Sequence, residues 1–415
     1  MRTSIILKIT PYLILLNCLW MFVHSFFKFT RIPQIYGYSI SLTIAFCCLN
    51  YYFKKRHIIA QQNRFLCVFY NILIFYTVIG FILAYFFPSS IYPFTRMNVY
   101  CSFLSFGLIF IFKNEYVWIR LFKLWWKYVP ITFVLLWWKL EPSMYAFVLS
   151  FCLFFILFVD EMKITKKIIV YVFLIIIGIW GMQQRITYIT LILPIVLLIF
   201  DKTGLAKNKK LCNIILHSAM WLPIILFILG ITGKFNILAM DSYVKEGYVS
   251  NSAGKMTEDT RTFLYEEALS SAVNNQYLIW GRTPAYGMDS PFVQSFDDAD
   301  YVGMALTIKG KMPQRICEAF IPNIITWCGI LGFLIFFLLF YKFSYRIINK
   351  SNSIKLRILG LYMTFFWTCS FITYPATNIS SDWIIVYLTI AISSSPQIMK
   401  LNDKEFTLLI RKATT

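Results

Sequence analysis

Apolar runs of about 17–25 residues recur along the chain from one end to the other, and a run of this length can cross a hydrocarbon layer of about 30 Å as an α-helix. Backbone groups in lipid must be satisfied internally, so only helices and closed barrels span membranes. The runs lack the short alternation of barrel strands, and hydrophobic residues make up 59% of the chain against 14% charged residues. We therefore expect an all-α polytopic membrane protein with a single integral membrane domain, residues 1–415.

About twelve of these runs are candidate membrane spans. The first follows Arg2 and Lys8 without a small-residue cleavage site, so we expect it to remain as a helix and not to be removed as a signal peptide. The fifth run belongs to a stretch, residues 119–138, that mixes charge with aromatic residues and could begin as an interfacial helix before it crosses the membrane. The expected ranges are 5–26, 34–53, 65–87, 97–112, 124–138, 143–161, 166–182, 186–201, 211–232, 319–341, 356–374 and 381–397.

Lys and Arg in the short connections set the expected orientation. Basic clusters within residues 54–64, 113–127, 163–167, 202–210 and 342–357 alternate with connections that are poor in these residues. The positive-inside rule places the clusters and both termini in the cytoplasm. The formal net charge of +20 falls on that side, so it reflects topology and gives no separate support for a nucleic-acid partner.

One long polar segment, residues 233–318, separates the ninth run from the tenth and falls on the predicted outer side. A connection of this length is usually functional or disordered, and its aromatic residues argue against disorder. We expect a helix from about Thr260 to Ser271, because Asp259 or Thr260 can cap it and apolar residues follow at helical spacing. Glycine and proline predict irregular structure from about residue 274 to residue 305.

Three arginines on the outer side are candidate ligands for an anionic substrate. Arg185 lies between the seventh and eighth runs, where it is either an interfacial residue or a guanidinium directed at a lipid-linked phosphate. Arg261 opens the loop helix, and Arg282 lies in a turn that begins with Trp280-Gly281. Either loop arginine can instead pair with a nearby carboxylate, and for Arg282 we favour that interpretation.

Glu318 is a candidate general base at the membrane edge, directly before the tenth run. A carboxylate at the start of a helix is normally a hydrated charge that the helix dipole stabilises. Cover by the loop would raise its pKa towards the range of a general base, and Arg315 would oppose that rise.

The sequence shows no pattern typical of a metal or nucleotide site. Most of the ten cysteines lie in apolar runs, the three histidines are scattered, and neither a CxxC motif nor a Walker-type loop is present. We expect no metal and no cofactor.

Several of these elements, in this order, resemble the superfamily of O-antigen polymerases and O-antigen ligases. Arg185 followed by Ile189 is a near match to its Arg-x-x-x-Leu element at the outer edge. Arg261, Trp280-Gly281 and Gly287 follow its pattern of an arginine-led loop helix and a hydrophobic-glycine turn. The ligases add a histidine, a small polar residue and a later Gly-x-x-Gly, and here Gly329-Ile-Leu-Gly332 matches while Glu318 and Ala319 occupy the other two positions. The absent histidine favours a polymerase over a ligase.

The resemblance implies a GT-C-like membrane glycosyltransferase with a large periplasmic loop between helices 9 and 10, in the bacterial inner membrane. Its implied reaction joins undecaprenyl-diphosphate-linked repeat units of an O-antigen, capsule or exopolysaccharide, without a metal and with inversion. The implied partners are the lipid-linked glycan, the bilayer and a chain-length regulator protein. Catalysis is expected from Glu318, Arg185 and Arg261, with substrate contacts from both of these arginines and from Arg282, Arg315 and Trp280.

Two alternatives stay open. An O-antigen ligase would use the same donor but transfer the glycan to the lipid A core. A flippase for lipid-linked oligosaccharide belongs to a different class, and transporters usually carry ionisable residues in the middle of their spans. Such residues are nearly absent here, which favours the enzyme.

Overall fold

The computed structural model describes residues 3–27, 32–87, 89, 91, 93–140, 149–180, 185–231, 262–290, 313–374, 377 and 379–414. This part of the chain is all-α apart from a short antiparallel pair of strands, β1 (Met288–Asp289) and β2 (Gln314–Arg315). Its first helices are α1 (Thr3–Cys18), α2 (Trp20–Phe27), α3 (Ile32–Gln62), α4 (Arg64–Phe86), α5 (Pro93–Ser105), α6 (Leu108–Phe112), α7 (Glu115–Leu136), η1 (Trp137–Lys139), α9 (Ser150–Phe155), η3 (Ile156–Glu161), α10 (Ile164–Trp180) and α11 (Arg185–Lys202). The later ones are η5 (Leu205–Lys207), α12 (Lys209–Ile231), α14 (Thr262–Asn274), α16 (Phe320–Lys350), α17 (Ile354–Cys369), α18 (Ser381–Ser394), α19 (Pro396–Met399) and α20 (Asp403–Thr414).

Four helical segments of the described chain are long and apolar enough to cross a membrane: Arg64–Phe86, Pro93–Phe112, Lys209–Leu229 and Phe320–Lys350. Two shorter apolar helices, α1 and α18, accompany them. These lengths and compositions are consistent with the expected helical membrane protein. Every apolar range singled out from the sequence falls largely on helix, but the number of about twelve spans and the side on which each terminus lies remain predictions.

Polar residues between the apolar runs decide where several helices begin. The side chain of Asn63 accepts a hydrogen bond from the backbone N–H of Leu66 at 3.1 Å and caps α4. Asn114 caps α7 in the same way through the N–H of Tyr116, also at 3.1 Å. Because of this cap, α7 begins at residue 115, well ahead of the predicted start at residue 124, and the basic aromatic stretch belongs to the same helix.

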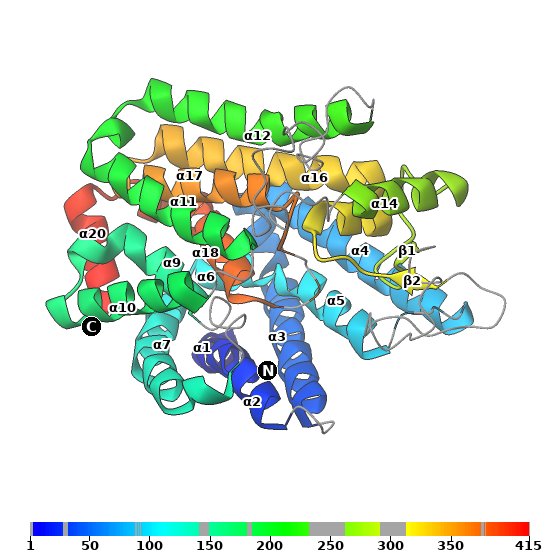
Figure 1. Ribbon diagram of the computed structural model, residues 1–415, viewed down its shortest axis with the longest axis horizontal. Coiled ribbons are helices and arrows are strands. Elements are labelled where there is room, and N and C mark those ends of the chain that lie inside the picture. Colours follow the sequence, from blue (N-terminus) through cyan, green and yellow to red (C-terminus); the bar gives the residue numbers. More distant parts are fainter. Residues whose placement is uncertain are drawn as a thin grey trace, which may run out of the picture.

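Helix α16 is the central element, because it packs against α12, α14, α17 and α18. Figure 1 shows α12, α16 and α17 running along one side of the molecule, with α14 and the β1–β2 pair at one end of α16 and α20 at the opposite end. Aromatic rings fill the contact between α16, α17 and α18. The fully buried ring of Trp383 lies 4.8 Å from Phe320 and 5.2 Å from Phe366, measured between centroids.

Candidate functional site

The described part of the long polar segment packs against one end of α16, and we call residues 262–290 and 313–319 the platform. The helix expected from Thr260 to Ser271 is observed as α14, Thr262–Asn274. Its Tyr265 donates a hydrogen bond to the carbonyl of Phe371 at 2.6 Å, which ties α14 to the end of α17. The platform is therefore attached to two of the core helices.

The platform is joined to α16 where that helix breaks. Gly329 has φ 67° and ψ −168°, values that interrupt the helical hydrogen bonds and leave backbone groups on both sides without helical partners. The turn after α14 supplies those partners. Arg282 N and Thr283 N donate to the carbonyls of Thr326 and Trp327 at 2.8 and 3.0 Å, while Ile330 N and Leu331 N donate to the carbonyls of Leu278 and Ile279 at 2.9 and 3.3 Å.

Two glycines make this close approach of two backbones possible. A Cβ on Gly329 would collide with the carbonyl group of Ile279, and a Cβ on Gly281 would collide with the backbone of Trp327 and Cys328. Both glycines also have a positive φ, 67° and 76°. The hydrophobic-glycine turn and the Gly-x-x-Gly element, which stand almost fifty residues apart in the sequence, thus contact each other directly.

Arg282 is held within the platform. Its guanidinium donates to Asp289 Oδ1 at 2.9 Å and to the carbonyl of Gly287 at 3.2 Å. It also lies 4.8 Å from the ring centroid of Tyr277 and 5.7 Å from that of Tyr286. Burial raises the pKa of Tyr277, although Ser271 and Arg282 act in the opposite direction. These contacts support the local-pairing interpretation of Arg282, with a carboxylate that sequence reasoning did not single out.

Arg315 is buried in the platform together with Glu267. Their side chains are 8% and 10% exposed, and Arg315 Nε lies 3.2 Å from Glu267 Oε2. The hydroxyl of Ser290 donates to the other carboxylate oxygen, Oε1, at 2.7 Å. This pair connects β2 to α14, so Arg315 is a structural residue in this arrangement.

Glu318 has an exposed side chain on a firmly held backbone. The amide of Asn323 bonds both the N–H and the carbonyl of Cys317, at 3.0 and 2.8 Å. Phe320 N donates to the carbonyls of Ser370 and Thr373, both at 3.1 Å. The described part of the loop therefore positions Glu318 without burying it, so these residues do not supply the cover that would raise its pKa.

Of the three remaining predicted residues, the structure describes Trp280 in full, Arg185 by its backbone alone, and Arg261 not at all. Trp280 is 67% exposed, and its carbonyl accepts a hydrogen bond from the hydroxyl of Tyr76 at 2.7 Å. Arg185 is the first residue of α11, but its side chain lies outside the described part, as does all of Arg261. Trp280, Arg282, Arg315 and Glu318 thus all belong to the platform, while the positions of the Arg185 and Arg261 side chains lie outside the described part of the chain.

Two buried polar residues near the platform were missed from the sequence. Asn323 is 1% exposed and fixes the turn before α16. Asp382 is 7% exposed in the first turn of α18, close enough to Tyr362 and Tyr374 to interact with them electrostatically. A polar residue inside an apolar run was the available signal, since such residues need partners when buried.

The described residues contain no group of three or more His, Cys, Asp or Glu side chains able to hold a metal ion. All ten cysteines are free and buried, as their positions in apolar runs predicted for most of them.

Comparison with protein-family models, curated proteins and solved structures finds no match to this chain.

Proposed function

We propose that this chain is a membrane glycosyltransferase that polymerises undecaprenyl-diphosphate-linked repeat units on the periplasmic face of a bacterial inner membrane. The observation that supports it most is the platform itself, which is fastened into the break of an apolar helix and carries the exposed side chains of Trp280 and Glu318. An exposed indole such as that of Trp280 offers a flat apolar face for a sugar ring, and the exposed carboxylate of Glu318 offers a proton acceptor.

The proposed reaction is a direct displacement at the anomeric carbon. Glu318 removes the proton from an acceptor sugar hydroxyl, the hydroxyl oxygen forms the new glycosidic bond, and undecaprenyl diphosphate leaves with the bonding electron pair. Arg185 and Arg261 stabilise the charge that develops on the departing diphosphate. Because the donor already carries a good leaving group, the reaction needs neither a nucleotide sugar nor a metal.

Arg282 and Arg315 take a different role in this proposal from the substrate contacts first expected of them. Each already has a carboxylate partner, Asp289 and Glu267 respectively. We assign both arginines to holding the platform in place, which leaves Arg185 and Arg261 as the arginines that bind substrate.

The experiment is reconstitution of the full-length protein in liposomes with undecaprenyl-diphosphate-linked repeat units, followed by gel or mass analysis of chain length. We expect a ladder of joined units from the wild type and none from Arg185→Ala. Arg411→Ala is the matched control, because it removes an exposed arginine of α20, on the side of the molecule opposite α14 in Figure 1, and we expect it to keep the ladder.

The same assay distinguishes the alternatives. Repeat units that cross the bilayer unchanged would indicate a flippase, and transfer only when lipid A core is present would indicate a ligase. A normal ladder from correctly folded Arg185→Ala protein would contradict the assignment of this arginine. Arg282→Ala should lower the folded fraction and activity together, whereas Arg185→Ala should lower activity alone.

A further inference from the structure

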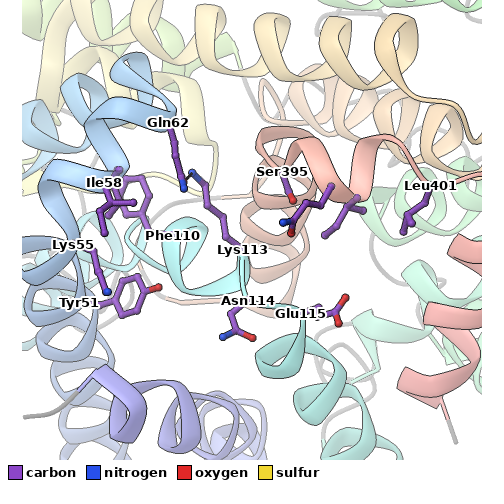
Figure 2. Close-up of a pocket in the computed structure, with 13 residues that line it drawn as sticks. Tyr51, Lys55, Ile58, Gln62, Phe110, Lys113, Asn114, Glu115, Ser395 and Leu401 are labelled. Carbon is purple, nitrogen blue, oxygen red and sulfur yellow. Dashed lines mark hydrogen bonds between the residues drawn. The ribbon is translucent and has the colours of Figure 1, made fainter.

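A cavity of about 520 Å³ is lined by residues of the basic clusters at 54–64 and 113–127. The positive-inside rule predicts that this side of the protein is cytoplasmic. Helix α3 forms one wall, the junction of α6 and α7 a second, and the chain from the end of α18 through α19 a third. Figure 2 shows side chains from these elements arranged around a common space. The volume falls within the range of about 300–1,000 Å³ that is usual for small-molecule sites.

The charges at this cavity favour an anion. Lys55 and Lys113 line it, together with one carboxylate, Glu115. Burial and, to a smaller extent, the positive charge of Arg346 on α16 together lower the pKa of Lys113 to about 8. Burial and a neighbouring cation both disfavour the charged form of such a lysine, and a bound anion stabilises that charged form.

Neutral polar side chains line the cavity together with the two lysines. Gln62 and Gln397 contribute amides, and Ser395 contributes a hydroxyl. Figure 2 shows Gln62 and Lys113 pointing towards one another, and Lys113 Nζ lies 3.3 Å from Gln62 Oε1. Asn114, which caps α7, also lines the cavity, so the positive end of the dipole of this helix lies at the same place. Cations, amide donors and a helix N-terminus are the groups that bind phosphate oxygens in proteins.

The remaining lining is apolar. Ile58, Phe110, Ile398 and Leu401 contribute to it, and Ile58 is itself partly exposed. A cavity with polar donors and an apolar lining suits a molecule with a phosphate at one end and a less polar portion at the other.

We propose that this cavity binds a phosphate-bearing small molecule, with Lys55 and Lys113 as the cationic ligands and Gln62 as a neutral one. The phosphate belongs either to the headgroup of an anionic lipid or to a soluble phosphate ester. This site lies apart from the platform, so the proposal does not rest on the function proposed for that region.

The test uses the purified full-length protein with two probes. One is dioleoylphosphatidylglycerol, with zwitterionic dioleoylphosphatidylcholine for comparison, and bound lipid is counted by native mass spectrometry. The other is glycerol 3-phosphate, whose binding to detergent-solubilised protein is measured by calorimetry. Retention of phosphatidylglycerol alone would identify a lipid headgroup as the ligand, and binding of glycerol 3-phosphate would identify a soluble ester.

The double variant Lys55→Gln/Lys113→Gln should weaken binding of whichever probe is recognised by about tenfold, since charge-assisted hydrogen bonds to phosphate are lost. Lys54→Gln is the matched control, because it removes the same charge from the neighbouring position of α3, and that residue is not part of the lining. If the double variant does not fold, Lys55→Gln alone carries the test with an expected weakening of about threefold. Binding of neither probe to the wild type, or equal binding by the lysine variants and the control, overturns the proposal.

Discussion

Substitution of Gly329 by alanine tests whether the junction between the platform and α16 holds this region together. The backbone at Gly329, with φ 67° and ψ −168°, lies in a region that is essentially restricted to glycine and costs another residue about 1–3 kcal/mol. The added Cβ would also collide with the carbonyl group of Ile279. Relief of that collision requires the two backbones to separate.

Separation puts four backbone hydrogen bonds at risk, those donated by residues 282, 283, 330 and 331. A net contribution of about 0.5–1.5 kcal/mol for each bond makes the loss of all four worth about 2–6 kcal/mol, more than the backbone strain alone. Because the collision with Ile279 forces the two backbones apart, we expect Gly329→Ala to destabilise the protein by about 2–6 kcal/mol. A loss of this size is a large fraction of the stability of most domains.

The assay is thermal unfolding of the full-length protein in detergent, combined with limited proteolysis of the platform. Gly178→Ala is the matched control, since Gly178 lies inside α10 and, among the described residues, a Cβ there would meet Leu191 Cδ2 alone, at 3.4 Å, an ordinary contact. We expect the control to unfold at or slightly above the wild-type temperature, because alanine favours a helix over glycine by about 1 kcal/mol. If Gly329→Ala were to unfold together with the control and keep the platform protected from protease, the reasoning about this junction would be wrong.

Two further predictions concern ion pairs. Removal of one partner from the buried Arg315–Glu267 pair, as in Arg315→Met, should lower the stability of the protein by about 3–5 kcal/mol. The double variant Arg315→Met/Glu267→Leu should recover most of that stability, because it leaves no unpaired buried charge. Equal losses of stability from the single and double variants in thermal unfolding would contradict this. Burial lowers the pKa of Lys355, but the hydrogen bond to Asp201 at 2.6 Å and the charges of Asp201 and Glu161 raise it more, so the pKa lies above 10.5. The resulting stabilisation is complete below pH 10.5 and is lost as pH rises through the raised pKa, so the unfolding temperature should fall there in the wild type and change less in Lys355→Gln.

The fold class and most helix positions follow from the sequence because they depend on local properties. Apolar runs of membrane length predict helices, and a capping residue such as Asn63 marks where one begins. The start of α7 was misplaced because its basic aromatic stretch suggested a boundary, whereas the cap at Asn114 lies earlier.

The candidate site was predicted less completely. Trp280, Arg282, Arg315 and Glu318 were recognised as one region, and the structure places them on one platform. Their roles differ, because pairing with Asp289 and Glu267 depends on how the chain turns after α14. Sequence spacing gives no measure of which carboxylate a turn brings within reach.

The sequence by itself therefore determines that this is a helical membrane-type chain with one long polar segment, because hydrophobicity and length are properties of each segment alone. Only the tertiary structure decides that the polar segment is fastened into a break in α16. Gly329 stands in an apolar run and its neighbours predict an uninterrupted helix. The hydrogen-bond partners that make the break stable come from the turn at Gly281, and their contact exists only when both segments are folded.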